Sequence, residues 1–266
     1  MKLIPSDEIR QYVRDRYKQI ATLPAGQDGC CDSGCGCLET PVDHNQIAAQ
    51  MGYSQAELSV VPEGANLGLG CGNPQAIAAL KDGETVLDLG SGGGFDCFLA
   101  ARQVGPRGKV IGVDMTPEMI AKARHNVRQG EYRHVEFRLG EIENLPVADS
   151  SVDCIISNCV INLSPDKPQV FREAFRVLQP GGRLAISDIV TTAELPTEIK
   201  EDMNSLSGCI SGASSISHLE AMLKQTGFAD IVIEAKDDSR QFIKDWVPGA
   251  NIDDFIVSAI IKAVKP

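Results

Sequence analysis

The sequence of 266 residues has no uninterrupted apolar run long enough to cross a lipid bilayer, which excludes a membrane-spanning helix. Its first residues, MKLIPSD, are polar and are not those of a signal peptide. Basic residues are also few, because 25 Lys and Arg are outnumbered by 36 Asp and Glu, giving a net charge of −11. A chain with this charge has no basic surface for nucleic acid or for an anionic membrane. We therefore expect a cytoplasmic, monomeric protein that acts on a small molecule.

Cysteine, by contrast, is plentiful, with nine residues in the chain. In a reducing cytoplasm, cysteines act as ligands or reactive thiols more often than as disulfide partners. The only segment of biased composition contains four of them, Cys30, Cys31, Cys35 and Cys37. This excess of thiols is the first indication of the chemistry.

The order of predicted elements indicates an α/β fold. From about residue 83, strands at 85–89, 109–114, 134–138, 152–157 and 183–188 alternate with helices, such as those at 95–103 and 168–178. A helix at 217–226 and two late strands at 228–234 and 254–264 follow. Alternation of this kind predicts a doubly wound, mostly parallel, seven-stranded sheet with helices on both faces. We divide the chain into a helical N-terminal extension with a cysteine-rich loop (1–66), a cofactor-binding core (67–190) and a modified C-terminal region that completes the sheet (191–266).

A glycine-rich turn, DLGSGGG at 88–94, lies between the first predicted strand and the helix after it. Glycine allows a tight turn and lets a ligand approach the backbone closely. Asp114 ends the next strand, where a carboxylate accepts hydrogen bonds from ribose hydroxyls. A pyrophosphate-binding turn would read G-x-G-x-x-G, which this segment does not. Asp88 is a poor neighbour for phosphate and a good one for a cationic amino acid.

This D-x-G-x-G-x-G pattern resembles motif I of the class I S-adenosylmethionine-dependent methyltransferases, which have a Rossmann-like fold. The resemblance implies that S-adenosylmethionine lies across the turn, with Asp114 on the ribose and the adenine beside Met115, Ile142 and Glu143. It places Asn158, at the end of the fourth strand, beside the transferable methyl group. The cofactor-binding residues implied in this way are Asp88, Gly90, Ser91, Gly92, Gly94, Asp114, Met115, Ile142, Glu143 and Asn158. An NAD-dependent oxidoreductase is the competing interpretation of the fold.

The residues available near the methyl group point to an unusual acceptor. Many methyltransferases use a general base, but the four histidines are scattered and none lies in a motif loop. Cys159 instead occupies the end of the fourth strand, while Cys71 and Cys209 lie in glycine-flanked loops. We expect these three thiols to converge above the carboxyl edge of the sheet. Thiolates select soft centres such as trivalent arsenic, whose lone pair needs no deprotonation.

Five segments together resemble the arsenite S-adenosylmethionine methyltransferases, and the resemblance covers nearly the whole chain. They are NLGLGCGNP at 66–74, the Asp88–Cys97 loop, Ile111–Met115, SNCVINLSPDKP at 157–168, and Leu195-Pro196 followed by Cys209. The resemblance implies methylation of arsenite and methylated arsenicals in arsenic detoxification, with Cys71, Cys159 and Cys209 as the arsenic-binding, catalytic thiols. It also implies that thiols supply electrons, that a further N-terminal cysteine takes part in disulfide formation, and that thioredoxin or glutathione restores the thiols.

Some alternatives stay open. Spacing does not choose among Cys30, Cys31, Cys35 and Cys37, whose loop could capture substrate, exchange disulfides or hold a structural zinc ion. We expect Cys97 and Cys154 to be packing residues. For the whole chain, the alternatives are a methyltransferase for a quinone or another carbon acid, with incidental cysteines, and a metalloid-binding sensor or chaperone.

Overall fold

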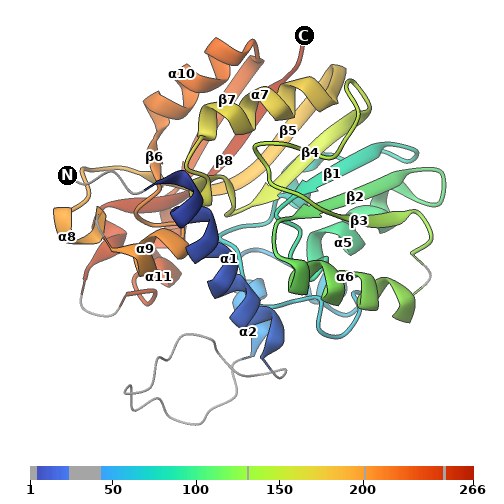
Figure 1. Ribbon diagram of the computed structural model, residues 1–266, viewed down its shortest axis with the longest axis horizontal. Coiled ribbons are helices and arrows are strands. Elements are labelled where there is room, and N and C mark those ends of the chain that lie inside the picture. The colour runs from blue at the N-terminus through green and yellow to red at the C-terminus, as the bar shows by residue number, and fades with distance from the viewer. Residues whose placement is uncertain (1–4, 24–42, 131, 201, 248–249) are drawn as a thin grey trace.

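The computed structural model describes residues 5–23, 43–130, 132–200, 202–247 and 250–266 (Figure 1). The predicted cysteine-rich loop, with Cys30, Cys31, Cys35 and Cys37, lies outside the described residues. Within the described part of the chain, no helix is both long and apolar enough to cross a membrane.

One sheet runs through the molecule in the order β3-β2-β1-β4-β5-β8-β7. Its parallel strands are β1 (Thr85–Leu89), β2 (Lys109–Asp114), β3 (Val135–Leu139), β4 (Val152–Asn158) and β5 (Leu178–Thr191). The last two strands, β8 (Ile256–Val264) and β7 (Ala229–Lys236), are antiparallel. The two-residue strand β6 (Ser214–Ser215) pairs with β5 beyond the end of β4. The doubly wound, mostly parallel sheet is confirmed, and its continuous path has the seven predicted strands.

One strand is longer than predicted. We expected a turn at 179–182, but β5 begins at Leu178 and passes through Gly181 and Gly182. The reason is pairing with the distant C-terminal end of the chain. The Gly181 N–H donates to the carbonyl of Lys265, and the Lys265 N–H donates to the carbonyl of Gly182, both at 2.8 Å. A local glycine pattern does not reveal a partner that lies so far away in sequence.

Helices cover both faces of the sheet (Figure 1). On one face, α5 (Phe95–Val104) and α6 (Pro117–Gln129) pack on side chains such as Val86. On the other face, α7 (Lys167–Val177) and α10 (Ile216–Thr226) pack on the alternate residues, such as Leu87. Both faces are therefore apolar, as a parallel sheet requires. Cys97 and Cys154 are fully buried in the first of these cores, as predicted.

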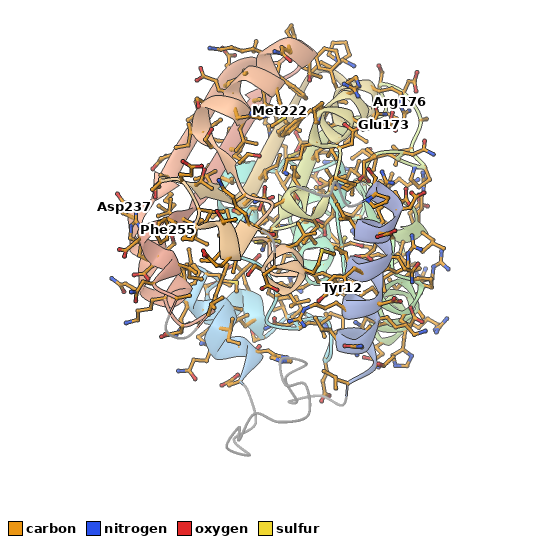
Figure 2. All side chains as sticks on the ribbon, turned by 60° about the vertical axis from the view of Figure 1, so that its left-hand side comes forward. Tyr12, Glu173, Arg176, Met222, Asp237 and Phe255 are labelled. Atoms are coloured by element: carbon orange, nitrogen blue, oxygen red, sulfur yellow. The ribbon has the colours of Figure 1, made fainter. Side chains whose placement is uncertain are left out.

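The remaining elements surround the carboxyl edge of the parallel strands. The N-terminal helix α1 (Ser6–Thr22) passes across this edge and contacts α6 and α9 (Figures 1 and 2). A capping box formed by Ser54 and Glu57 begins α3 (Gln55–Leu58). The other short helices are α2 (His44–Gln50), α4 (Gln75–Ala78), α8 (Thr197–Lys200), α9 (Met203–Ser207) and α11 (Arg240–Ile243), with 3-10 turns η1 (Ile161–Leu163), η2 (Asp237–Ser239) and η3 (Ile252–Asp254).

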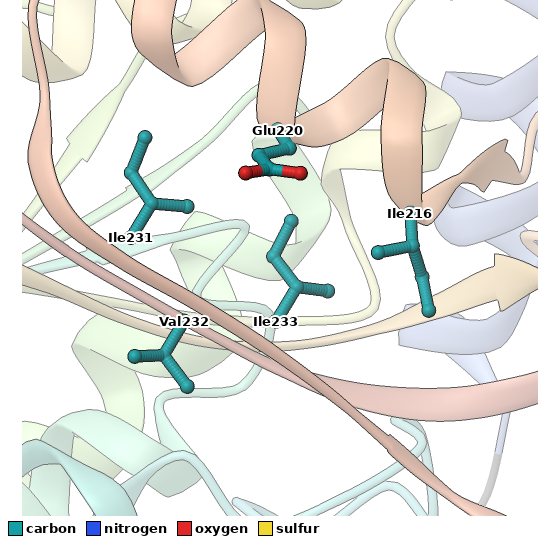
Figure 3. A pocket seen from close by; sticks show the side chains of 5 residues that line it. All are labelled: Ile216, Glu220, Ile231, Val232 and Ile233. Atoms are coloured by element: carbon teal, nitrogen blue, oxygen red, sulfur yellow. The ribbon is translucent and has the colours of Figure 1, made fainter.

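A cavity of about 320 Å³ lies between α10 and the edge strand β7 (Figure 3). Its lining is mostly aliphatic, with the carboxylate of Glu220 directed toward it, and none of its residues belongs to the predicted site. The candidate site is therefore built from the residues at the carboxyl edge of the sheet.

Candidate active site

Three cysteines far apart in sequence meet at the carboxyl edge of the sheet. Cys71 precedes α4, Cys159 follows β4 and Cys209 follows α9, and their exposed fractions are only 1%, 8% and 3%. The sulfur atoms of Cys71 and Cys159 and a carboxylate oxygen of Asp188 all lie within 4.8 Å of one another. The Cys209 thiol donates to the carbonyl of Cys159 at 2.6 Å. The structure thus brings the three predicted thiols into one buried group, called the thiol cluster below.

Two thiols of this cluster, those of Cys159 and Cys209, favour their protonated form. Hydrogen bonds with Cys209 and Cys71, together with burial, raise the pKa of Cys159 well above its usual value. The hydrogen bond with Cys159 lowers the pKa of Cys209, but burial and the nearby Asp188 carboxylate raise it, and the net shift is upward. Desolvation penalises a thiolate because no solvent stabilises its charge. Cys159 and Cys209 therefore hold neutral sulfur at neutral pH.

The backbone at two of these cysteines is strained. Cys159 has φ of 58° and Cys209 has φ of 64°, in the left-handed region that favours glycine. Such a conformation costs about 1–3 kcal/mol per residue and persists only where the surroundings hold it. The surroundings hold Cys159 in this conformation, because its N–H donates to the Ser187 carbonyl at 2.8 Å. The end of β5 therefore fixes the direction in which Cys159 presents its sulfur.

Asp188, also at the end of β5, anchors the loop that carries Cys159. Its carboxylate accepts hydrogen bonds from the Ile161 N–H at 3.0 Å and from the Asn162 amide at 2.8 Å. Burial raises the pKa of Asp188 to about 6. Asp188 was not among the predicted site residues. Its position gave a signal, because a carboxylate at the end of the predicted strand 183–188 lies at the same edge of the sheet as the motif loops.

Cys71 is held by a hydrogen-bond network from three other segments. The Asn158 side chain accepts from the Cys71 N–H at 3.0 Å and donates to the Gly72 carbonyl at 2.8 Å. The same amide donates to the Tyr53 hydroxyl at 3.1 Å, and Tyr53 in turn donates to the Asp96 carboxylate at 2.7 Å. Asn158, predicted at the cofactor, thus uses its amide to hold the Cys71 loop.

Sequence analysis did not identify Tyr53 or Asp96. Asp96 had a weak signal, because it is an acidic residue directly after a glycine-rich turn, in the first turn of a helix. Burial raises its pKa to about 6, while the hydrogen bond from Tyr53 opposes the shift. Tyr53 had no signal, since it lies 43 residues before Asp96 in a segment with no motif.

The glycine-rich turn has the backbone that its sequence predicts. Gly90 has φ of 69°, and a Cβ atom there would lie 2.3 Å from the side chain of Val160. Asp114 accepts hydrogen bonds from the Gly92 N–H at 3.0 Å and the Thr116 N–H at 2.8 Å. The predicted turn and the predicted ribose carboxylate are therefore adjacent. Gly94, with φ of 94°, ends the turn and begins α5.

Four other predicted cofactor residues are placed as follows. The Ser91 hydroxyl is directed at Gly112 on β2, because a Cβ at Gly112 would lie 2.7 Å from it. Glu143 accepts from the Ser164 hydroxyl at 2.6 Å and is 3.5 Å from the Arg10 guanidinium of α1. Ile142 packs on the core beneath α7, and Met115 packs on the apolar cluster that contains the three thiols. The adenine end of the predicted site is thus covered by α1.

Comparison with known proteins decides the family. A family model described as a methyltransferase domain matches residues 80–227. An arsenite methyltransferase of Halobacterium salinarum is 53% identical, with 98% of this chain and 67% of that protein covered. The chain belongs to the arsenite methyltransferase family.

Two further relatives agree with this membership. The human arsenite methyltransferase is 34% identical, with 86% of this chain and 60% of that protein covered. The crystal structure of an arsenic (III) S-adenosylmethionine methyltransferase from Chlamydomonas reinhardtii has a TM-score of 0.62 and 31% identity, covering 85% of this chain and 75% of that one. The chain spans 51% to 67% of the length of the first three curated relatives. This arsenite methyltransferase family member is an S-adenosylmethionine-dependent enzyme with the class I fold.

The buried carboxylates of this chain fit S-adenosylmethionine. Asp88, Asp96 and Asp114 are carboxylates near one another at the carboxyl edge, and burial raises the pKa of each. Among the described residues, none of the three forms a salt bridge, and Asp88 accepts a hydrogen bond only from the Cys97 thiol, at 3.2 Å. Buried carboxylates without a basic partner suit a ligand that brings positive charge and hydroxyl donors. S-adenosylmethionine brings a sulfonium, an ammonium group and a ribose.

Proposed function

We propose that this chain methylates trivalent arsenic bound by Cys71, Cys159 and Cys209, using S-adenosylmethionine, in arsenic detoxification. One observation carries the proposal: the three buried thiols meet at the sheet edge where the buried carboxylates fit the cofactor. The relatives named arsenite methyltransferases support arsenite as a substrate, and methylated arsenicals are the substrates that we propose for later transfers. We place this activity in the cytoplasm and in a monomer.

Capture of arsenite by the thiols needs no net charge transfer. Each thiol sulfur forms a bond to arsenic, one hydroxide leaves, and the thiol proton leaves with it as water. Three such exchanges turn As(OH)3 into a neutral arsenic atom with three sulfur ligands. The raised pKa values of Cys159 and Cys209 are compatible with this step, because the proton departs in the product water. Burial then favours the neutral product over a charged one.

The bound cofactor supplies an electrophilic methyl group. The chain itself orients the two partners, with Asp114 at the ribose, the glycine-rich turn under the cofactor and the thiol cluster holding arsenic. Alignment of two reactants in a dry site accounts for a large part of a rate enhancement. A general base is unnecessary because the arsenic lone pair carries no proton, and no histidine of the described residues belongs to the thiol cluster.

Single cysteine variants test the proposal. We expect Cys71→Ser, Cys159→Ser and Cys209→Ser to lose methylated arsenic products by at least about 100-fold, since each removes one ligand and the alignment it supplies. Mass spectrometry of arsenic species after incubation with arsenite and a thiol reductant measures this. The matched control is Cys154→Ala, a buried cysteine of β4 outside the cluster, which should retain activity. Normal product formation by Cys159→Ser would contradict the mechanism.

We also propose that a disulfide forms during turnover. Methyl transfer gives a methylated arsenic cation whose formal oxidation state is higher by two. A further thiol, predicted among the N-terminal cysteines, attacks one arsenic-bound sulfur: the S–S bond forms, the As–S bond breaks and returns its electron pair to arsenic, and the attacking thiol releases one proton. Thioredoxin or glutathione then restores the thiols. Omitting the reductant should leave the first transfer intact and stop later turnovers, as a single-turnover assay measures; equal multiple-turnover rates with and without it would refute this step. The choice among Cys30, Cys31, Cys35 and Cys37 stays a prediction, as does the division at residues 66 and 190.

A further inference from the structure

The N-terminal helix α1 is attached to the cofactor side of the site by four ion pairs. Its basic residues recur every four positions, which puts them on one face of the helix. Their partners belong to the segment after β3 and to α6. Arg10 pairs with Glu143 at 3.5 Å and with Glu141 at 3.6 Å, Arg14 pairs with Glu141 at 3.3 Å, and Lys18 pairs with Glu118 at 3.2 Å. These contacts hold α1 across the carboxyl edge of the sheet.

A neighbouring face of α1 contacts the arsenic side. Val13 is fully buried in the apolar cluster that also contains Cys71, Cys159 and Cys209, and Tyr17 and Met115 pack against this cluster. Met115 follows Asp114 directly, so the cluster that Tyr17 packs against extends from the thiols toward the ribose carboxylate. Burial raises the pKa of Tyr17 well above its usual value, and Cys209, Cys159 and Asp114 act in the same direction. The phenol is thus neutral and lies within electrostatic reach of both halves of the site.

We propose that Tyr17 forms the wall of the methyl-transfer site and that its hydroxyl oxygen contacts the sulfonium group of bound S-adenosylmethionine. The inference rests on the proposed function, because it uses the thiol cluster as the acceptor side. Methyl transfer requires the sulfonium to lie between the ribose carboxylate and the arsenic. Val13 and Tyr17 are the α1 residues in the apolar cluster that contains the three thiols, and of these two Tyr17 carries a hydroxyl.

The chemistry of this contact favours the cofactor over its product. A neutral phenol oxygen is electron-rich and attracts the positive charge shared by the sulfonium and its methyl group. After transfer, the same sulfur is an uncharged thioether and the attraction disappears. Tyr17 therefore helps the enzyme to hold S-adenosylmethionine more tightly than S-adenosylhomocysteine, and its ring keeps water away from the reacting atoms.

Binding measurements without arsenic test the inference. The variant Tyr17→Phe removes only the hydroxyl, and isothermal titration with S-adenosylmethionine and with S-adenosylhomocysteine gives two dissociation constants. We expect the affinity for S-adenosylmethionine to fall about 3- to 10-fold, as for loss of one polar contact, while that for S-adenosylhomocysteine changes less than about twofold. The control Gln19→Ala, on an exposed part of the same helix, should change neither constant.

Two outcomes would overturn the assignment: equal weakening of both ligands, or no weakening of either. Arsenite titration of the same variant separates this inference from the proposed function. If Tyr17→Phe and the wild type bind arsenite equally, the thiol cluster is intact and the cofactor result stands on its own. If the wild type binds no arsenite, the proposed function fails, and with it the assignment of Tyr17 to a wall facing arsenic.

Discussion

The substitution Tyr53→Phe removes a single oxygen from the network that holds Cys71. Tyr53 is 4% exposed, and its hydroxyl donates to the Asp96 carboxylate at 2.7 Å and accepts from Asn158 at 3.1 Å. A hydrogen bond to a charged group contributes about 1.5–3 kcal/mol and a neutral one about 0.5–1.5 kcal/mol. We therefore expect a loss of about 2–4 kcal/mol in the free energy of unfolding. The ring remains, so no cavity forms.

The loss should also weaken arsenite binding, because the Asn158 amide that holds the Cys71 loop loses its 3.1 Å bond to Tyr53 and keeps only the Gly72 carbonyl and a longer, 3.4 Å bond to Asp96 as acceptors. If about 2 kcal/mol of the loss falls on the positioning of Cys71, affinity drops about 30-fold, since 1.4 kcal/mol is tenfold. Titration of the fully reduced protein with arsenite measures this, and alkylation of Cys71, followed by peptide mass spectrometry, should become faster.

The matched control is Tyr132→Phe. The Tyr132 hydroxyl donates to the Val60 carbonyl at 3.0 Å, away from the thiol cluster. This variant should lose about 1 kcal/mol of stability and bind arsenite normally. If Tyr53→Phe loses the expected stability but keeps arsenite affinity within about twofold of the wild type, the network supports the fold only, and the reasoning about Cys71 is refuted.

Three further predictions concern the cofactor side and pH. Asp114→Asn should weaken S-adenosylmethionine binding about 10- to 100-fold by calorimetry, because a charge-assisted acceptor for ribose hydroxyls is lost; unchanged affinity would remove Asp114 from the ribose site. Gly90→Ala should abolish cofactor binding while arsenite binding persists, since the new Cβ would lie 2.3 Å from Val160 at a φ of 69°; a variant with normal cofactor affinity would contradict the tight-turn argument. Burial raises the pKa of Asp96 to about 6, so between about pH 4 and 6 the folded chain binds one proton more than the unfolded chain. The free energy of unfolding therefore falls as pH rises through this window, by about 3 kcal/mol for a pKa shift of about two units. Asp96→Asn should flatten this part of the profile in denaturant titrations; a slope identical to that of the wild type would argue against the shift.

Sequence alone predicted the elements that local rules determine. The strands Thr85–Leu89 and Lys109–Asp114 have the predicted bounds because each is a short apolar run with turn residues at its end. The convergence of Cys159 with the motif loops followed from the geometry of parallel strands, whose carboxyl ends share one edge. Cys71 and Cys209 were singled out by their glycine neighbours, and the structure places both at this edge of the sheet, close to Cys159.

Residues that depend on contacts between distant segments were beyond the reach of the sequence. Tyr53 reaches Asp96 only after the segment between them has folded over the sheet, and Tyr17 reaches the thiols only through the path of α1. The length of β5 depends on pairing with Lys265 at the C-terminal end of the chain. None of these contacts has a periodic or spacing signal, because each joins residues whose separation in sequence is arbitrary.

The bond from the Cys209 thiol to the carbonyl of Cys159 has a consequence for survival of the enzyme between encounters with its toxic substrate. Oxidants and electrophiles attack the anionic form of a cysteine, and here the resting sulfur keeps its hydrogen engaged with a neighbouring carbonyl. Peroxide or an alkylating metabolite therefore finds little to react with. Arsenite, the substrate that we propose, differs because its hydroxide can carry that hydrogen away in water, so the same hydrogen bond protects the Cys209 thiol from oxidants and leaves it open to arsenic.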